Sequence, residues 1–375
     1  MMIYECKSGE ANKQTNKRTN KRTNELYMKQ NTWLIIMAGG VGSRFWPVST
    51  EEKPKQFLDM LGLGRTLFQQ TVDRFNGICS PKNILVVTSQ KYVGIIKEQC
   101  PELPEENILA EPCMRNTAPC IAYACYKIKK KDPQATIVVS PADHLIPETS
   151  IFQQTIVEGL EFVESNPAIL TLGITPRHPE TGYGYIHMTN KNERFTKVKA
   201  FKEKPYLETA KSYLATGDYL WNAGIFLWSN ETIISDFEKY NLPIAKAFND
   251  GMPFYYTDKE QDYIDSIYPG CENISIDYCI MEKADDIYVK AVQFQWSDLG
   301  TWSALWNKTG KSEQGNYSSS PGSSFYESSD NIVYVDSDKK VVIQGLNDYI
   351  IVDANNVLLI CKKGEEQRIK EFRNK

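Results

Sequence analysis

The segment 37–58, MAGGVGSRFWPVSTEEKPKQFL, is rich in glycine and basic residues. It begins at the last residue of the apolar run at 33–37. Glycines in a turn let backbone N–H groups approach phosphate oxygens, because no Cβ stands in the way. Basic side chains in the same turn supply the counter-charge that phosphate oxygens need. The segment therefore predicts a cradle for a nucleoside triphosphate, formed by Gly39, Gly40, Gly42, Arg44 and Lys55.

Two familiar glycine motifs do not fit this segment. A Walker A loop ends in Gly-Lys-Ser/Thr, whereas this turn continues Gly42-Ser43-Arg44. A dinucleotide fingerprint runs G-x-G-x-x-G into an amphipathic helix, whereas residues 45–47 here read FWP. A purely structural turn has no need of several basic residues together. A phosphate cradle is therefore the interpretation that we keep.

Two aspartates are candidate magnesium ligands. Asp143 follows the apolar stretch 135–140, at the edge where an α/β sheet presents its ligand-binding groups, and Asp298 lies in the aromatic segment WSDLGTW at 296–302. Either residue could equally be an ordinary capping aspartate. Mg²⁺ commonly takes one or two carboxylates together with phosphate oxygens and water, so the pair suits a triphosphate site. His144 is interpreted as structural, because a nucleophile that is already a phosphate dianion has no proton to remove.

Three further segments have residue types that suit a sugar phosphate. Glu203 and Lys204 follow a predicted strand, where the carboxylate can accept hydrogen bonds from sugar hydroxyls and the ammonium can hold a phosphate. The segments 181–185 (TGYGY) and 221–224 (WNAG) add glycines, aromatic rings and the Asn222 amide. Charged strand ends and core turns can also have these compositions. Both interpretations therefore stay open for each segment taken alone.

Strand and helix patterns alternate along the chain, which is typical of an α/β fold. Continuous apolar strands of this kind are buried on both faces, so we predict a largely parallel, doubly wound sheet with ligands at the carboxyl ends of its strands. We expect strands near 33–37, 83–88, 107–109, 135–140, 168–172, 196–202 and 224–228, and helices near 66–75, 116–131, 151–164 and 275–283.

Composition excludes several classes of protein. The chain has 375 residues, 41% of them apolar and 24% charged, and no apolar run approaches the roughly 20 residues of a membrane span. The formal net charge of −4 gives no general affinity for nucleic acid or for a membrane, so small molecules are the expected partners. Nine scattered cysteines without a C-x-x-C pair, and only three histidines, are typical of a cytoplasmic protein with no structural zinc site.

Three parts are expected along the chain. Residues 1–28 contain the repeat TNKR-TNKR and almost no apolar residues, which predicts a disordered polar tail. Residues 29–315 should form the ligand-binding α/β domain. Residues 316–375 begin with the serine-rich stretch 318–324, interpreted as a linker, and continue with four apolar stretches eight or nine residues apart. Short, evenly spaced strands predict a small β domain with a few coils of β-helix.

Taken together, these motifs resemble the mannose-1-phosphate guanylyltransferases of the sugar-nucleotide pyrophosphorylase family. The similar motifs occur in order between residue 33 and about residue 310, and the short β-rich C-terminal region is also similar to what this family carries. The resemblance rests on GGVGSRFWP (39–47), PKQF (54–57), EPCMRNTAP (111–119), ADH (142–144), PETGYGYI (179–186), EKP (203–205), WNAG (221–224) and the Asp298 segment.

The resemblance implies a Rossmann-like, GT-A-like nucleotidyltransferase catalytic domain at 29–315, with a mixed, mainly parallel sheet and helices on both faces. It implies an enzyme that uses Mg²⁺ to convert GTP and α-D-mannose 1-phosphate into GDP-mannose and pyrophosphate, by in-line attack of the sugar phosphate on the α-phosphorus. The catalytic cations that it implies are Arg44 and Lys55. The implied nucleotide ligands are Gly39, Gly40, Gly42, Ser43, Arg44, Lys55, Arg115, Asn116 and Thr117, the implied sugar-phosphate ligands are Gly182, Tyr183, Glu203, Lys204 and Asn222, and the implied metal ligands are Asp143 and Asp298.

Some features depart from the family pattern, and some questions stay open. The polar N-terminal extension is unusual, Lys202 stands where an apolar residue is common, and the chain stops before any cupin-type isomerase domain. A related pyrophosphorylase for another base and sugar is one alternative, and a non-catalytic sugar-nucleotide sensor is another. The presence of acidic and basic residues at all the implied positions argues against the sensor. The oligomeric state is open, with a homodimer as one option, and the residues that read guanine are not identified.

Overall fold

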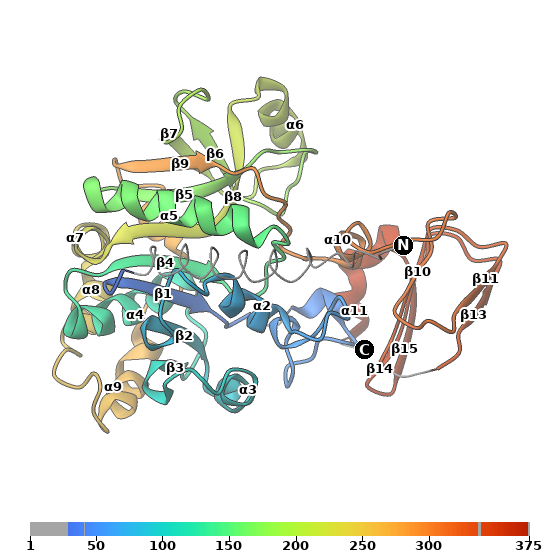
Figure 1. Cartoon of the computed structure of the whole chain (residues 1–375), viewed down its shortest axis with the longest axis horizontal. Helices are drawn as coiled ribbons and strands as arrows, with labels where there is room; N and C mark the ends of the chain where they lie inside the picture. Colours follow the sequence, from blue (N-terminus) through green and yellow to red (C-terminus); the bar gives the residue numbers. More distant parts are fainter. Residues whose placement is uncertain (1–28, 41, 337–338, 374–375) are drawn as a thin grey trace, which may run out of the picture.

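The structure is a computed structural model that describes residues 29–40, 42–336 and 339–373. The polar tail expected at 1–28 lies outside the described residues. A nine-stranded mixed sheet forms the centre of the molecule, with the strand order β3-β2-β1-β4-β8-β5-β9-β7-β6 (Figure 1). Its strands are β1 (Thr32–Met37), β2 (Ile84–Ser89), β3 (Ile108–Glu111), β4 (Thr136–Pro141), β5 (Ile169–Ile174), β6 (Tyr185–Met188), β7 (Thr196–Lys202), β8 (Tyr219–Ser229) and β9 (Ile287–Ala291).

The first part of this sheet is parallel, as the sequence predicts. β1 pairs parallel with β2 and β4, and β2 pairs parallel with β3. β8 runs antiparallel to β4 and β5, and β6 and β7 form another antiparallel pair. The prediction of a mainly parallel sheet is therefore wrong beyond β4, apart from the parallel pair β5 and β9. The short connection at 189–195 allows only antiparallel pairing of β6 with β7, since a parallel crossover needs about a dozen residues or more.

Helices cover both faces of the sheet, as in a doubly wound fold. Trp33 and Ile35 of β1 face a buried cluster with α4, α7, α8 and α9, whereas Leu34 and Ile36 face a second buried cluster with α2, α3 and α5. This alternation follows from the two-residue period of a strand. The helices are α2 (Leu67–Arg74), α3 (Val93–Gln99), α4 (Thr117–Lys131), α5 (Thr149–Ser165), α6 (Leu207–Thr216), α7 (Asn230–Tyr240), α8 (Leu242–Asn249), α9 (Glu260–Ile267), α10 (Trp302–Trp306) and α11 (Ile369–Arg373).

Most predicted elements occur within a few residues of their expected bounds. Thr66, for example, caps α2 by accepting from the backbone N–H of Gln69. The helix expected at 275–283 is instead a short π-helix, Asp277–Met281, in which the N–H of Glu282 donates to the carbonyl of Asp277 at 2.9 Å. Single π turns of this kind are often found at functional sites.

The C-terminal strands form successive coils at one end of the molecule (Figure 1). β10, β12 and β14 pair parallel in a sheet that ends on the antiparallel strand β15, and β11 pairs parallel with β13 in a second sheet. Residues one coil apart lie side by side, as Ile332 does with Ile350. The strands are β10 (Tyr317–Ser318), β11 (Ser324–Tyr326), β12 (Ile332–Val335), β13 (Val342–Gln344), β14 (Tyr349–Ala354) and β15 (Val357–Lys362).

The serine-rich stretch at 318–324 is not a linker, so this prediction is wrong. It forms the connection between β10 and β11, and its hydroxyls bond to neighbouring coils. Ser319 Oγ donates to the carbonyl of Val335 at 3.0 Å, and Ser320 Oγ donates to the carbonyl of Lys339 at 2.9 Å. Serine is common both in flexible linkers and in ordered turns, so composition alone could not separate the two.

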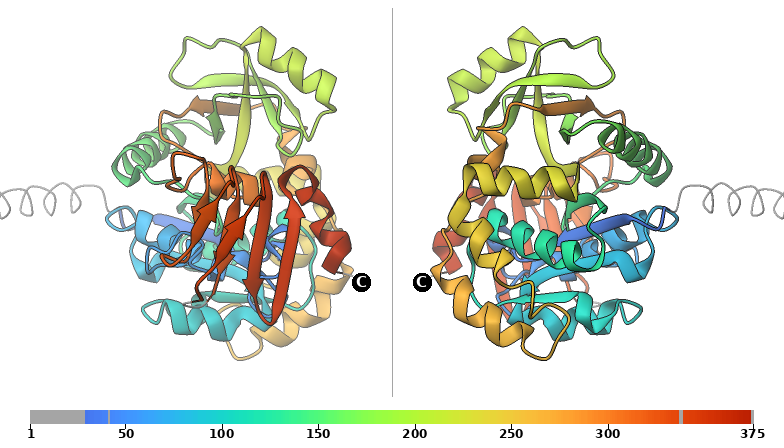
Figure 2. Two further views of the ribbon diagram at one scale, coloured as in Figure 1. Left: turned by 90° about the vertical axis from the view of Figure 1, so that its right-hand side faces the viewer. Right: turned by 90° about the vertical axis from the view of Figure 1, so that its left-hand side faces the viewer.

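A third buried cluster joins the C-terminal region to loops of the α/β part, against which it packs as a β layer (Figure 2). Phe45 from the glycine-rich loop and Leu299 beside Asp298 pack with Ile350 and Ile369 of the C-terminal region. The two parts therefore share one core around these loops. Within the described ranges, no helix has the length and apolar character needed to cross a bilayer.

Candidate active site

The side chain of Gln56 holds the glycine-rich loop that follows β1. Its amide donates to the carbonyls of Ala38 at 3.1 Å and Gly40 at 2.8 Å. Gly42 has φ 64°, and a Cβ at this position would lie 2.6 Å from the Cβ of Lys55. Only glycine tolerates such a close approach in a left-handed conformation. The loop therefore folds back tightly against the segment that carries Lys55.

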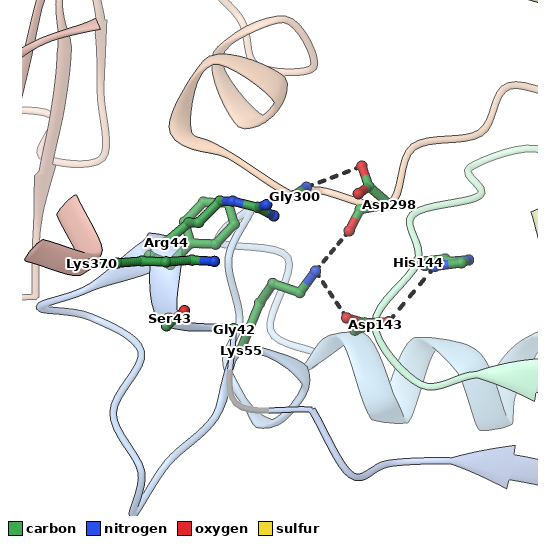
Figure 3. A pocket seen from close by; sticks show the side chains of 10 residues that line it. Gly42, Ser43, Arg44, Lys55, Asp143, His144, Asp298, Gly300 and Lys370 are labelled. Atoms are coloured by element: carbon green, nitrogen blue, oxygen red, sulfur yellow. Dashed lines mark hydrogen bonds and ion pairs between the residues drawn. The ribbon is translucent and has the colours of Figure 1, made fainter. Parts of the chain in front are cut away.

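Lys55, at the start of the short helix η2 (Lys55–Phe57), is a buried cation that connects two acidic segments (Figure 3). Its Nζ donates to the carbonyls of Asp298 at 2.7 Å and Leu299 at 3.1 Å, and it lies 3.0 Å from Oδ2 of Asp143. An ammonium group has three N–H donors, so three protein oxygens suffice to engage them all. Lys55 therefore positions Asp143 relative to the turn at 298–299.

Asp143 follows β4, and its neighbours keep it ionised. Burial raises the pKa of a carboxyl group, but the charge and hydrogen bond of Lys55 act in the opposite direction, and the pKa of Asp143 lies below its ordinary value. Burial also holds the pKa of His144 below its ordinary value. Trp296 Nε1 donates to His144 Nδ1 at 3.2 Å, so a neutral ring carries its proton on Nε2, which lies 3.8 Å from Oδ1 of Asp143. This geometry suits the structural role expected for His144.

The carboxylate of Asp298 is held from one side. Its Oδ1 accepts from the Tyr183 hydroxyl at 2.7 Å and from the Gly300 backbone N–H at 3.1 Å. A Cβ at residue 300 would lie 2.5 Å from Oδ2, so any larger residue there would displace the Asp298 carboxylate. Leu299, between the two, has φ 44°, which is uncommon for a residue with a side chain. Tyr183 is a predicted sugar ligand, but its hydroxyl bonds to Asp298 instead.

These groups line a polar cavity of about 260 Å³ (Figure 3). Arg44 lies at its edge, where Nε donates to Oε1 of Gln367 at 3.0 Å, and Lys370 of α11 extends its ammonium into the same space. The C-terminal region thus contributes to a site that the sequence predicts only from segments before residue 300. The predicted residues that the cavity brings together are Gly42, Ser43, Arg44, Lys55, Asp143 and Asp298.

A second cavity, of about 240 Å³, shares His144 and Asp298 with the first. The rings of Tyr183 and Trp296 in its wall pack edge-on, and the buried ring of Trp221 packs edge-on against Tyr183 from outside the lining. Strands β6, β7 and β8 are neighbours in the sheet, which brings their ends together here. All the predicted sugar-phosphate residues line this cavity, namely Gly182, Tyr183, Glu203, Lys204 and Asn222.

Asn222 has a fixed amide orientation in the second cavity. Its Oδ1 accepts from the N–H of Gly224 at 3.0 Å and from Oγ1 of Thr171 at 3.3 Å, while its Nδ2 donates to Oδ1 of Asp277 at 2.9 Å. Burial and the nearby carboxylate of Glu203 raise the pKa of Asp277 to about 6. Sequence reasoning missed Asp277, because an aspartate at the start of a helical pattern has no distinctive local signal.

Glu203 and Lys204 form an ion pair with each other. Lys204 adopts φ 42°, just after the end of β7. The side chain of Glu203 is 14% exposed and that of Lys204 is 61% exposed, so the carboxylate is largely enclosed while the ammonium stays open to solvent. A phosphate that enters this cavity therefore meets an accessible ammonium.

Comparison with known proteins reveals the family of this chain. A family model described as nucleotidyl transferase matches residues 34–315. Mannose-1-phosphate guanylyltransferase from Klebsiella pneumoniae is 35% identical over 347 residues, which cover 90% of this chain and 72% of that protein. The protein of the same name from Salmonella montevideo is 36% identical over 348 residues, with the same coverage. The chain belongs to the mannose-1-phosphate guanylyltransferase family.

A solved structure extends this likeness to the fold. The crystal structure described as mannose-1-phosphate geranyltransferase from Thermus thermophilus matches with a TM-score of 0.83 and 27% sequence identity, and the match covers 92% of this chain and 99% of that one. A match of this extent includes much of the C-terminal β region. The chain is therefore a nucleotidyltransferase whose C-terminal region is part of the shared fold.

Several predicted nucleotide ligands of this guanylyltransferase line neither cavity. Arg115 donates to the carbonyl of Pro269, and Asn116 caps α4 by accepting from the N–H of Thr117 at 2.9 Å. Thr117 itself lines the second cavity, whereas the glycines at 39–40 line neither of the two. The cap at Asn116 is a local contact of the kind that the sequence predicts, whereas the contact of Arg115 with Pro269 joins residues 154 positions apart and has no local signal.

Glu111, at the carboxyl end of β3, is another residue that sequence reasoning left without a role. Burial raises the pKa of Glu111 to about 7, although the Tyr268 hydroxyl, which donates to Oε1, acts in the opposite direction. Its Oε2 lies 3.5 Å from the position that a Cβ on Gly39 would take. Glu111 therefore faces the glycine-rich loop. Its position as the first residue of the motif EPCMRNTAP is the sequence signal that could have identified it as a candidate site residue.

The two predicted metal ligands suit a divalent cation that also binds phosphate oxygens. Across 29–40, 42–336 and 339–373, no three His, Cys, Asp or Glu side chains are grouped in a way that could hold a metal ion. Mg²⁺ commonly needs only one or two carboxylates, with phosphate oxygens and water as its other ligands. Asp143 and Asp298 line the same cavity, and Oδ2 of Asp298 accepts no hydrogen bond from any described residue. This donor set fits Mg²⁺.

Proposed function

We propose that this chain transfers GMP from GTP to α-D-mannose 1-phosphate, which gives GDP-mannose and pyrophosphate. The observation that carries the proposal is the junction of two cavities at Asp298 and His144. One cavity has glycines and cations suited to a triphosphate, and the other has carboxylates, an amide and aromatic rings suited to a sugar phosphate. Membership of the family supports the reaction class.

The proposed reaction is an in-line displacement at the junction of the cavities. A phosphate oxygen of mannose 1-phosphate attacks the α-phosphorus of GTP, and the bond between that phosphorus and the oxygen bridging to the β-phosphate breaks. Pyrophosphate leaves with the electron pair, and the attacking dianion has no proton to lose. Catalysis then depends on alignment and on charge stabilisation. Arg44 stabilises the departing pyrophosphate, and Lys204 holds the sugar phosphate.

Lys55 acts in this proposal as a positioning residue. The sequence suggested direct contact with the triphosphate, but the three oxygens around Nζ already match its three donors. Asp143 and Asp298 would hold Mg²⁺, which supplies positive charge to offset the negative charge at the reacting phosphates. The lowered pKa of Asp143 keeps this ligand ionised at neutral pH.

A panel of substrates tests the proposal. Pyrophosphate release is measured in the presence of Mg²⁺ for GTP, UTP, dTTP, ATP and CTP, each with mannose 1-phosphate and with glucose 1-phosphate. We expect the fastest release with GTP and mannose 1-phosphate. A clear preference for another pair would assign the chain to a different pyrophosphorylase reaction. Nucleotide binding without turnover of any pair would favour a sensor.

Within this proposal, Glu111 is assigned to the recognition of guanine. A carboxylate only accepts hydrogen bonds, and guanine offers two adjacent donors, N1–H and the 2-amino group. Adenine lacks both of these donors. Glu111 lies at the carboxyl edge of the sheet, where α/β folds bind nucleotides, and its Oε2 faces Gly39 while Tyr268 engages Oε1.

Glu111→Gln is expected to weaken the selection of GTP over ITP, which lacks the 2-amino group. The ratio of kcat/KM values for the two nucleotides should change by about 1.5–3 kcal/mol, the scale of one hydrogen bond to a charged group. Glu105→Gln is the matched control, because it removes an exposed carboxylate near the start of β3. An unchanged ratio in Glu111→Gln would remove Glu111 from the base site.

The pH dependence of the same ratio gives a second readout. Because the pKa of Glu111 is about 7, the carboxylate is mostly ionised only above that pH. The wild-type preference for GTP over ITP should therefore decrease as the pH falls from about 8 to about 6, whereas that of Glu111→Gln should stay flat. The two nucleotides have the same triphosphate, so its own ionisation cancels in the ratio. A flat wild-type profile would contradict the assignment.

A further inference from the structure

The first cavity has one cation that the C-terminal region supplies. Lys370 lies on α11, and Figure 3 shows its side chain beside Arg44 with the ammonium directed toward the space around Lys55. The proposed mechanism gives this lysine no part. Its position is separated by more than 300 residues from the glycine-rich loop, so only the folded chain brings the two together.

Lys370 differs from the other basic residues of its segment. Lys363 pairs with Asp348, Arg368 pairs with acidic residues at 365 and 371, and Arg373 pairs with the acidic residue at 51. Lys370 forms no hydrogen bond or ion pair with any residue that the structure describes. An exposed ammonium without an acidic partner, at the edge of a polar cavity, remains available for an anion.

The backbone that carries Lys370 is nevertheless firmly held. Ile369 is fully buried in the cluster that also contains Phe45 and Leu299. Two side chains of the preceding residues are also held: Gln367 Oε1 accepts from Arg44, and Glu366 Oε2 accepts at 2.9 Å from the N–H of Ser303 in α10, the helix that follows the turn at 298–300. The lysine therefore has a defined place relative to both loops of the first cavity, although its ammonium is free to move.

The negative charge of a bound triphosphate would exceed the positive charge that Arg44 and Lys55 can supply in the first cavity. A triphosphate and the departing pyrophosphate each bring several negative charges. Lys55 is already neutralised by Asp143 and engaged by two backbone carbonyls, so it adds little net positive charge for a ligand. Arg44 and Lys370 are the cations of this cavity that form no ion pair with a carboxylate of the described residues.

We propose that Lys370 binds the β- and γ-phosphates of the nucleotide, and then the departing pyrophosphate, so that the C-terminal β region completes the triphosphate site. Lys370 lies beside Arg44, away from the second cavity, and this is the side on which the leaving group must sit when the sugar phosphate attacks in line from the second cavity. The proposal rests on the proposed function for the identity of the ligand, and on the cavity itself for the binding of polyphosphate.

Lys370→Gln and Lys370→Arg test this proposal, with Arg368→Gln as the matched control. Arg368 is on the same segment, but its cation is paired with acidic neighbours outside the cavity. In Lys370→Gln, the KM for GTP and the KM for pyrophosphate in the reverse reaction should each rise on the order of tenfold, as expected for the loss of one charge-assisted contact. The KM for mannose 1-phosphate should not change. Lys370→Arg should retain most of the wild-type behaviour.

Calorimetric binding of inorganic pyrophosphate separates this proposal from the proposed function, because it requires neither the base nor the sugar. Weaker binding to Lys370→Gln than to Arg368→Gln supports the role of Lys370, even if the preferred substrate pair is not GTP and mannose 1-phosphate. Equal pyrophosphate affinity and equal KM values in the two variants would overturn it. Lys370 is exposed, so both variants should keep the wild-type melting temperature.

Discussion

Lys55→Ala should lower kcat/KM for GTP by about 2–4 kcal/mol of transition-state stabilisation, which is roughly thirty- to a thousandfold. The ammonium holds Asp143 at 3.0 Å and the carbonyls of the 298–299 turn at 2.7 and 3.1 Å. Its removal separates the two segments that carry the proposed metal ligands and leaves buried acceptors without a donor. The main loss should appear in kcat, because Lys55 is proposed to position the reacting groups rather than to bind nucleotide.

The same change should also lower the stability of the fold, and this effect must be measured separately. Unpaired buried acceptors destabilise by about 1–3 kcal/mol, which urea unfolding of Lys55→Ala and Lys55→Met would detect. Lys53→Ala is the matched control, because Lys53 is an exposed lysine of the same loop and should leave both activity and stability unchanged. Wild-type kcat in Lys55→Met would show that the ammonium has no part in catalysis.

Asp298→Asn should have a comparable effect, with a loss of about 2–4 kcal/mol in kcat/KM. The substitution keeps the shape of the side chain but removes the charge proposed to hold Mg²⁺. The amide oxygen can still accept from Tyr183 and Gly300, so the turn should keep its conformation. The measured activity should recover only in part at raised Mg²⁺ concentration, because the weakened ligand is neutral.

The control for Asp298→Asn is Asp286→Asn, which removes an exposed carboxylate that is paired with Lys197 far from both cavities. This variant should keep the wild-type dependence on Mg²⁺. Magnesium titrations of pyrophosphate release compare the two variants directly. The metal role of Asp298 fails if Asp298→Asn and Asp286→Asn follow the same titration curve with the same kcat.

The sequence predicted the fold well where local patterns are sufficient. Buried strands such as β1 and β4 are continuous apolar runs, and α2 begins at a capping threonine, so each has its signal within a few residues. The antiparallel insertion of β8 between β4 and β5 has no such signal, because pairing direction depends on which distant strand lies next to it. The stretch at 318–324 was misassigned for a similar reason, since the partners of its serines lie in later coils.

The candidate site also combines features that have a local sequence signal with features that depend on distant partners. Residue types and order were sufficient to select Lys55, Asp143, Asp298 and the Glu203–Lys204 pair as candidates, and the structure places these residues around two adjoining cavities. The partners of those residues were not predictable. Tyr183 bonds to Asp298 over 115 residues of sequence, and Asp277 approaches Asn222 only because a π turn faces β8.

The sequence by itself determined which chemical groups this protein offers and the order in which they occur along an α/β chain. The tertiary structure decided which partners each group contacts. It matches the donors of Lys55 with oxygens of Asp143 and of residues 298–299, so that this lysine joins the acidic segments, and it brings Lys370 of the C-terminal region to the edge of the first cavity. The physical reason is that hydrogen bonds and ion pairs depend on distances in space, whereas sequence patterns report only the local conformation and burial of each segment.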